Sequence, residues 1–360
     1  MDIAGTYTSA EIESRANSTQ QILDEVRRAH ASRPIDLFLS YFYNSHFDPD
    51  GFAELRRIGI PSVNFYCNSM YQFDLVDRIA AKADYAWHTE RGAHKFYVEA
   101  GANPVWVQMG ADPALYHPRP DIPRLKSACF VGQRYCDRDR WVASLVRAGV
   151  PVDIYGAGWS GRGGADVYVN PGVKESRSAL GRHKPAPGSW RSYLRVFQNN
   201  VAANGFLAGL LRSARQLRYR RETHALTSLI ASRVRGRAED VTSVFAGHEI
   251  CLNFSNVWSD GKPGSQLIPH VRLRDFEGPM SRTCYLSGYS DEIAEFYEIG
   301  REIDTYVSYD ELVDKTRFYL RRPEAAEKLR DAGYRRALRD HTWRNRFKEL
   351  FRKMGMRVGE

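Results

Sequence analysis

The chain has 360 residues, of which 43% are hydrophobic and 26% charged, and its formal net charge is +9. This apolar content can bury a core in each of two domains, and no run approaches the roughly 20 apolar residues of a membrane span, which excludes an integral membrane protein. The N-terminus lacks a signal-peptide pattern and the five cysteines form no CxxC pair, so we expect a cytoplasmic protein with reduced thiols.

The N-terminal part of the chain alternates helices with strands. A helix over residues 8–31 opens with Thr8 and Glu11 in capping-box spacing. The patterns that follow predict a strand over 35–43, a helix over 48–59, a strand over 61–67, a helix over 70–82, a strand over 84–89, a helix over 91–101 and a strand over 104–110. This alternation predicts an α/β domain with a parallel sheet, which we assign to residues 1–118.

A stretch with four prolines, residues 111–126, indicates a linker, and a second α/β series follows it. We assign residues 119–337 to a C-terminal domain, and residues 338–360 to a helix that can cross back to the first domain. In such doubly wound domains the ligand lies at the carboxyl ends of the strands. The predicted elements are a strand over 127–132, a helix over 137–149, a strand over 152–159, a helix over 238–249, a strand over 250–255, a short helix over 275–282, a strand over 284–288 and a helical stretch over 309–354 broken near Pro323.

The positive charge is concentrated in residues 161–238, which we interpret as a basic insert. The segment has fifteen Lys and Arg against three Asp and Glu, a net +12, whereas the rest of the chain sums to −3. Within it, residues 204–222 interleave apolar residues with five arginines, which suits a helix on an anionic membrane surface or one that offers arginines to an acidic acceptor. A solvated basic helix, or nucleic-acid binding by counterion release, explains the same composition.

Glycines at the ends of two predicted strands are candidates for contact with a nucleotide. Gly132 ends a predicted strand and is followed by Arg134 and Arg138, so a phosphate could approach the backbone beside bidentate donors and a helix N-terminus. Gly156 and Gly158 end the next strand and leave room for a base or a sugar. The alternative interpretation of Gly132 is an ordinary strand-to-helix turn with solvated arginines. The alternative interpretation of Gly156 and Gly158 is a tight turn.

Three acids and one histidine are further candidates. Glu277 begins a short helix after a long polar loop, where a carboxylate can accept hydrogen bonds from ribose hydroxyls or simply stabilise the helix N-terminus. Asp48 and Asp50 have the spacing of a metal-binding DxD pair, but a helix cap is the favoured interpretation. His46 lies just beyond a predicted strand, as a catalytic group or as an ordinary surface residue.

Several stretches, taken in order, resemble the CgeB-like (spore maturation protein) glycosyltransferases, which are similar to retaining GT-B enzymes that use nucleotide-sugars. The resemblance rests on CLNFS, RLRDFEGPM and the helical stretch to residue 347 in the C-terminal half, and on FVGQRYCDRDRWVASLVRAGVPVDIYGAGW and MGADPALYHP before it. It implies a GT-B fold, α/β with two Rossmann-like domains facing a cleft, a shortened N-terminal domain and C-terminal helices.

The resemblance also implies roles for individual residues. The Arg-x-Phe-Glu motif of the group falls on Arg274, Phe276 and Glu277, which makes Glu277 the expected clamp for the donor ribose. The implied catalytic set is Glu277, Arg138, Arg274 and His46, and the implied donor-binding set is Gly132, Gln133, Arg134, Gly156, Gly158, Asn253, Ser255, Arg272 and Phe276. Gln133 stands where arginine is frequent, Pro269 where a second glutamate is usual, and Arg282 where a glycine is usual.

The predicted function is transfer of a sugar from a nucleoside-diphosphate donor to an unknown acceptor, with retention and without a metal or other cofactor. The alternative is a non-catalytic protein that binds a polyanion or a membrane surface through the basic insert. A homo-oligomer and peripheral contact with a membrane are two further possibilities. The sequence does not specify the base or the sugar of the donor.

Overall fold

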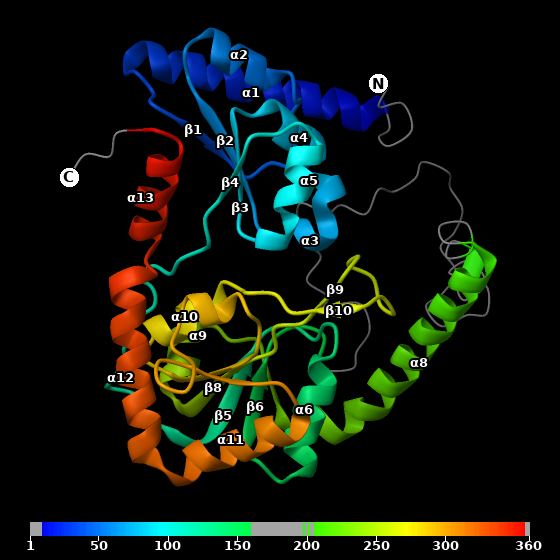
Figure 1. Cartoon of the computed structure of the whole chain (residues 1–360), viewed down its shortest axis with the longest axis vertical. Helices are drawn as coiled ribbons and strands as arrows, with labels where there is room; N and C mark the ends of the chain where they lie inside the picture. The colour runs from blue at the N-terminus through cyan, green and yellow to red at the C-terminus, as the bar shows by residue number, and fades with distance from the viewer. Residues whose placement is uncertain (1–8, 160–196, 199–200, 202–204, 357–360) are drawn as a thin grey trace. The chain divides into compact units, whose positions relative to one another are not determined.

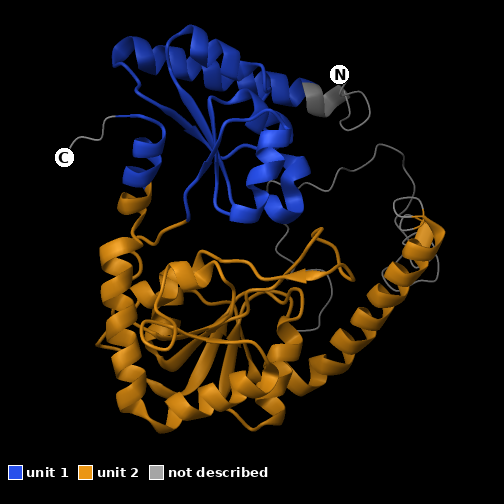
Figure 2. Ribbon diagram, viewed as in Figure 1, with its two compact units in different colours: residues 1–108, 169–184, 347–360 blue, residues 109–168, 185–346 orange. Residues whose placement is uncertain are grey.

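The computed structural model describes residues 9–159, 197–198, 201 and 205–356, and the chain divides into two compact units (Figures 1 and 2). Unit 1 comprises residues 1–108, 169–184 and 347–360, and unit 2 comprises residues 109–168 and 185–346. Residues 161–196, 199–200 and 202–204 of the predicted basic insert lie outside the described residues. Both units contain a parallel sheet with helices packed against it, so the predicted α/β class is confirmed.

Unit 1 is built on a four-stranded parallel sheet in the order β1-β2-β3-β4. Its core gathers Leu23, Phe47, Phe52, Leu55 and Ile79 from the helices and loops around the sheet. Its elements are α1 (Ser9–Ser32), β1 (Phe38–Ser40), α2 (Gly51–Arg57), β2 (Ser62–Tyr66), α3 (Ser69–Gln72), η1 (Phe73–Leu75), α4 (Asp77–Lys82), β3 (Tyr85–His88), η2 (Arg91–Ala93), α5 (His94–Glu99) and β4 (Pro104–Trp106).

Unit 2 contains a six-stranded parallel sheet in the order β12-β11-β8-β5-β6-β7. In chain order these strands follow the 3-2-1-4-5-6 arrangement of dinucleotide-binding folds. The elements are β5 (Leu125–Val131), α6 (Arg138–Arg147), β6 (Val152–Tyr155), α8 (Phe206–Ile230), η3 (Ala231–Arg233), β7 (Val234–Gly236), α9 (Val241–Ala246), β8 (His248–Asn253), β9 (Val257–Trp258), β10 (Leu267–Ile268), α10 (Arg274–Met280), β11 (Cys284–Gly288), η4 (Ile293–Glu295), β12 (Asp304–Tyr306), α11 (Tyr309–Arg321), α12 (Pro323–Asp340) and α13 (Trp343–Lys353).

Local sequence explains where the C-terminal helices begin. Ser308 caps α11 by accepting a hydrogen bond from the Glu311 backbone amide at 3.2 Å, and the Glu311 side chain accepts one from the amide of Val307, the residue before the cap, at 2.8 Å. Pro323 occupies the first turn of α12, where a missing amide hydrogen costs nothing. The predicted break near Pro323 is therefore confirmed.

The end of α13 packs on the sheet of unit 1. The Phe347 ring lies 5.6 Å from that of Trp87, and the Tyr85 hydroxyl donates to the Met354 carbonyl at 3.0 Å. Lys353 donates to the Trp106 carbonyl at 2.7 Å. The last described residues of the chain thus complete a unit whose sheet comes from its first 108 residues.

Several sequence predictions differ from the observed elements. The predicted helix over residues 70–82 is broken into α3, η1 and α4, and the predicted strand over 35–43 pairs only through β1. The strands β7, β9, β10 and β12 were not predicted. Because α8 leads directly into β7, which pairs with β6 at the edge of the sheet, the last part of the predicted insert belongs to the sheet itself.

Candidate functional site

The candidate site lies in unit 2, where the strand order reverses. The strands β5 and β8 are neighbours at the centre of the sheet, and the chain leaves them in opposite directions across it. Ligands of open parallel sheets bind at the carboxyl ends of the strands at such a point. The loop over residues 132–137 follows β5 and a longer loop over 254–273 follows β8, so both meet at this edge.

Gly132 places the backbone of the first loop in tight contact with the neighbouring strand. Its amide donates to the Tyr155 carbonyl at 2.8 Å, and its carbonyl accepts from the Trp159 indole at 2.7 Å. A Cβ at Gly156, which has φ of 141°, would overlap the Gly132 carbonyl. The missing side chain at Gly156 therefore lets two strand-end loops approach each other, and the conformation at Gly158, with φ of 81°, also favours glycine.

Arg138 opens α6 directly beneath this loop. Its side chain is buried, one terminal nitrogen donates to the Gln133 carbonyl at 2.9 Å, and its Nε has no hydrogen-bond partner among the described residues. Burial, together with the nearby positive charge of Arg272, lowers the pKa of Arg138 from 12.5 to about 9. A buried cation without an ion-pair partner is costly unless an anion binds beside it.

Arg272 is tied to the start of α6 through a short chain of hydrogen bonds. Its guanidinium donates to the Asn256 carbonyl at 3.4 Å, and the Asn256 amide donates to the Asp137 carboxylate at 2.8 Å. The Trp141 indole donates to the same carboxylate at 2.9 Å. These contacts hold two arginines and a helix N-terminus at one strand edge, an arrangement that favours a polyanion such as a diphosphate.

The loop between β5 and α6 also contains a residue in a sparsely populated conformation. Cys136 is buried and has φ of 61°, one of two non-glycine residues with positive φ in the described part of the chain. Burial raises the pKa of its thiol to about 12, so the side chain is an inert neutral group. Strain of this kind is found most often at functional loops.

Glu277 lies on the first turns of α10 and is buried with two partners. Arg274 donates to its carboxylate at 2.6 Å, and the Tyr116 hydroxyl interacts electrostatically with both side chains. Burial and the charge of Glu277 raise the pKa of Tyr116 to about 12. A carboxylate has about four lone-pair positions, so Glu277 retains the capacity to accept hydrogen bonds from a ligand.

Asp275, which the sequence analysis did not single out, organises the ends of β8 and β11. One of its oxygens accepts hydrogen bonds from Asn253 at 2.9 Å, Tyr285 at 2.9 Å and Ser287 at 2.8 Å, and the other accepts from the Arg272 amide at 2.7 Å. Burial raises the pKa of Asp275, and its four donors oppose that effect. The predicted donor-binding residue Asn253 thus directs its amide into this internal network.

A cavity of about 190 Å³ opens at the carboxyl ends of β8, β11 and β12. Ser255, another predicted donor-binding residue, lines it and donates to the Gly288 carbonyl at 3.3 Å. Pro269, at the position where the resembling group carries a glutamate, is also in its wall. The lining residues are Trp141, Ser255, Asn256, Pro269, Gly288, Tyr289, Tyr306 and Val307.

The other predicted site residues have different surroundings. Arg134 donates to Thr227, Asp139 and the Thr223 carbonyl, which fixes α8 against α6. Phe276 is fully buried beside Phe296 and the guanidinium of Arg346. Gln133 presents its carbonyl to Arg138 and has an exposed side chain.

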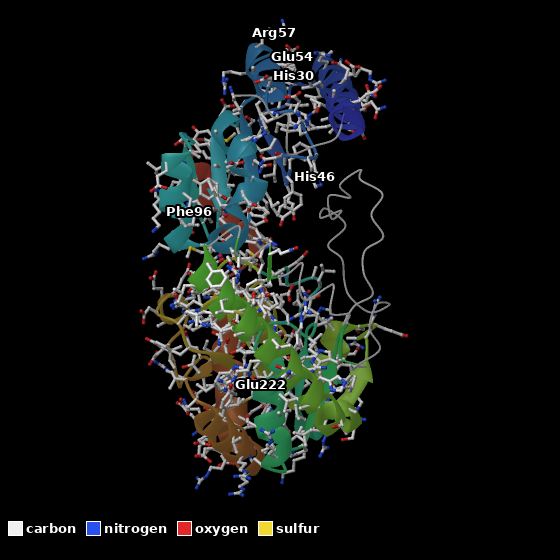
Figure 3. The ribbon with its side chains drawn as sticks, turned by 90° about the vertical axis from the view of Figure 1, so that its right-hand side faces the viewer. His30, His46, Glu54, Arg57, Phe96 and Glu222 are labelled. Atoms are coloured by element: carbon white, nitrogen blue, oxygen red, sulfur yellow. The ribbon has the colours of Figure 1, made fainter. Side chains whose placement is uncertain are left out.

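His46 lies in unit 1, in the loop after β1, where its ring contacts Tyr43 at 4.7 Å (Figure 3). Nothing in that loop tests its predicted catalytic role, which stays a prediction. The nearby Asp48 accepts a hydrogen bond from the Asp50 amide at 3.2 Å, whereas Asp50, the residue before α2, makes no side-chain hydrogen bond that caps the helix. Across the described residues there is no cluster of three or more His, Cys, Asp or Glu arranged to hold a metal ion.

Residues 208–352 match the family described as glycosyl transferase-like, and no curated protein sequence matches the chain. In the part of the chain that the structure describes, no helix is both long and apolar enough to cross a membrane.

Solved structures identify the fold as that of GT-B glycosyltransferases, as predicted. The chain is similar to HepE of Anabaena in complex with UDP and glucose, with a TM-score of 0.55 and 10% identity over 93% of this chain and 81% of that one. It is also similar to sucrose-phosphate synthase from Thermosynechococcus elongatus, with a TM-score of 0.54 and 12% identity over 94% of this chain and 78% of that one. A glycosyltransferase from Rickettsia africae is similar with a TM-score of 0.55 and 8% identity over 98% of this chain and 83% of that one.

Proposed function

We propose that the protein is a glycosyltransferase that takes a sugar from a nucleoside-diphosphate donor. The observation that carries the proposal is Arg138, a buried arginine that forms no ion pair within the described residues and lies with Arg272 at the N-terminus of α6. A diphosphate at this edge would supply the missing negative charge. The UDP and UDP-glucose complexes of the similarly folded HepE support this class of ligand.

Each part of such a donor has a matching group in unit 2. Gly132 lets the diphosphate approach the backbone beside Arg138, and Glu277 accepts hydrogen bonds from the ribose hydroxyls. Arg274 and Tyr116 hold the Glu277 carboxylate in place. We assign one ring of the donor to the cavity beside Ser255, because a nucleotide-sugar carries a ring on each side of its diphosphate.

The reaction follows from this placement. The bond between the anomeric carbon and the diphosphate oxygen breaks, the acceptor oxygen bonds to that carbon, and the acceptor proton passes to the leaving diphosphate. Arginines at the developing charge stabilise the leaving group, so the proposed transfer needs no metal. Retention follows if the acceptor attacks from the face that the diphosphate leaves, as the CgeB-like resemblance implies.

The test is nucleotide binding with a single carboxylate altered. We expect UDP, GDP or dTDP to raise the melting temperature of the wild-type chain, and Glu277→Gln to weaken the binding about tenfold or more, since hydrogen bonds to charged groups contribute roughly 1.5–3 kcal/mol. The matched control is Glu222→Gln, a surface residue on α8 labelled in Figure 3, which should behave as the wild type does.

A deoxyribose analogue isolates the proposed ribose contact. If Glu277 binds the ribose hydroxyls, the wild-type chain should prefer the ribonucleoside diphosphate to its 2′-deoxy form, and Glu277→Gln should lose that preference. An unchanged preference would contradict the role of Glu277. The absence of a melting shift with every nucleotide would contradict the donor site as a whole.

A further inference from the structure

The helix α8 exposes an apolar stripe near its N-terminal end. Phe206, Leu207, Leu210 and Leu211 are 67%, 73%, 47% and 54% exposed, and their spacing of three and four residues places them on neighbouring positions of one helix surface. Phe206 keeps this exposure although its ring lies 6.4 Å from that of Phe197. Figure 1 shows α8 running outward from the sheet of unit 2.

The opposite side of α8 is anchored to unit 2. Arg212 forms an ion pair with Asp260, and the Tyr219 ring contacts Trp258 edge-on at 5.3 Å. Further along, Arg134 reaches the Thr223 carbonyl. These contacts hold α8 in one rotation about its axis, so the apolar stripe faces away from the described part of the sheet domain in unit 2.

The exposed side continues as a basic stripe. Arg215, Arg218 and Arg221 follow Leu211 at intervals of three and four residues and are all exposed. Arg218 pairs with Glu222, whereas Arg215 and Arg221 form no ion pair within the described residues. An apolar end followed by arginines on one helix surface matches a bilayer interface, where apolar side chains enter the acyl boundary and guanidinium groups meet anionic headgroups.

We propose that α8 docks unit 2 on the surface of an anionic lipid membrane. Phe206, Leu207, Leu210 and Leu211 enter the interface, and Arg215 and Arg221 contact the lipid phosphates. The charge of the segment favours this partner over a neutral surface, because residues 161–238 carry a net +12 in a chain whose remainder sums to −3. The docking does not depend on the donor site, so either proposal can fail without the other.

Vesicle flotation with the full chain tests the proposal. We expect the wild type to float with vesicles of phosphatidylcholine and phosphatidylglycerol and to bind phosphatidylcholine alone much less. The double substitution Leu207→Ser and Leu211→Ser should reduce the binding at least about tenfold, because burial of one leucine alone accounts for roughly that factor. Arg215→Gln with Arg221→Gln should weaken it and reduce its salt dependence.

The controls distinguish membrane binding from binding of another partner to the apolar stripe of α8. Val98→Ser, at a 56% exposed position on α5, should leave vesicle binding unchanged, and thermal melting verifies that every variant is folded. Absence of wild-type flotation would overturn the proposal, as would equal binding by the serine variant. Salt-sensitive DNA retention without flotation would identify a polyanion site, and loss of a wild-type dimer in the serine variant without flotation would identify a second copy as the occupant.

Discussion

Replacing Arg138 with methionine should stabilise the ligand-free protein and abolish its response to nucleoside diphosphates. The pKa of Arg138 is lowered from 12.5 to about 9, so the folded state disfavours the charge that this side chain carries at pH 7. At about 1.4 kcal/mol for each pKa unit, the penalty is at most roughly 5 kcal/mol. The penalty is fully present at neutral pH, because Arg138 stays charged there, and it decreases only as pH rises above about 9.

Methionine removes this charge but also some favourable contacts. The hydrogen bond to the Gln133 carbonyl is lost, which costs about 1 kcal/mol, and the shorter side chain leaves space that costs about 1–2 kcal/mol more. We therefore expect a net gain of about 1–3 kcal/mol in the free energy of unfolding. A nucleotide at 100 times its dissociation constant stabilises the wild type by about 2.7 kcal/mol, and the variant should show none of that gain.

Urea unfolding with and without UDP, followed by far-UV circular dichroism, measures both effects. Arg140→Met is the matched control, because Arg140 lies on the same helix, pairs with Glu222 and keeps its charge near the surface. It should gain no stability and should retain the UDP response. If Arg138→Met unfolds more readily than the wild type, or still responds to UDP, Arg138 is a structural arginine and the anion site is elsewhere.

Three further changes test other parts of unit 2. Burial lowers the pKa of His341 to about 3, so the unfolded chain binds a proton at this residue at a higher pH than the folded chain does. The free energy of unfolding should therefore fall as pH drops below about 6.5. His341→Gln should reduce this pH dependence, measured by urea unfolding at pH 7.5 and pH 5. Asp275→Ala removes the shared acceptor of four donors and should cost about 3–5 kcal/mol in the same assay, whereas Asp291→Ala, at an exposed position, should cost less than about 0.5. Arg282 has φ of 55°, so Arg282→Gly should be more stable than Arg282→Ala by about 1 kcal/mol, although both lose the ion pairs to Glu327 and Asp331.

The sequence predicted most of the sheet in unit 2 because its central strands are continuous apolar runs. Residues 127–130 of β5 and 250–253 of β8 are buried one after another, so both faces of these segments are covered and the sequence shows them as continuous, mostly apolar runs. The strands β7, β9, β10 and β12 have only two or three residues, too few for any period to show. The positions of β7 and β12 also depend on pairing with β6 and β11, which the chain reaches by longer connections.

The candidate site was only partly predictable, because several of its contacts join residues far apart in the chain. Tyr116 meets Glu277 across more than 150 residues, and Arg134 was assigned to the donor although Thr223 and Thr227 occupy its guanidinium. Arg282 also gains a physical explanation. Its backbone is left-handed, a conformation that favours glycine, and two ion pairs to α12 compensate for the strain.

The contrast between Asp275 and Arg138 distinguishes structural from functional burial of charge. Both side chains are buried within a few residues of the switch point, and burial disfavours the charged form of each. Four donors from the protein surround Asp275, so its charge is satisfied without a ligand and it can hold the strand ends in place. Arg138 has one carbonyl and no ion-pair partner among the described residues, so its buried charge destabilises the ligand-free chain, and the proposed diphosphate would offset that cost.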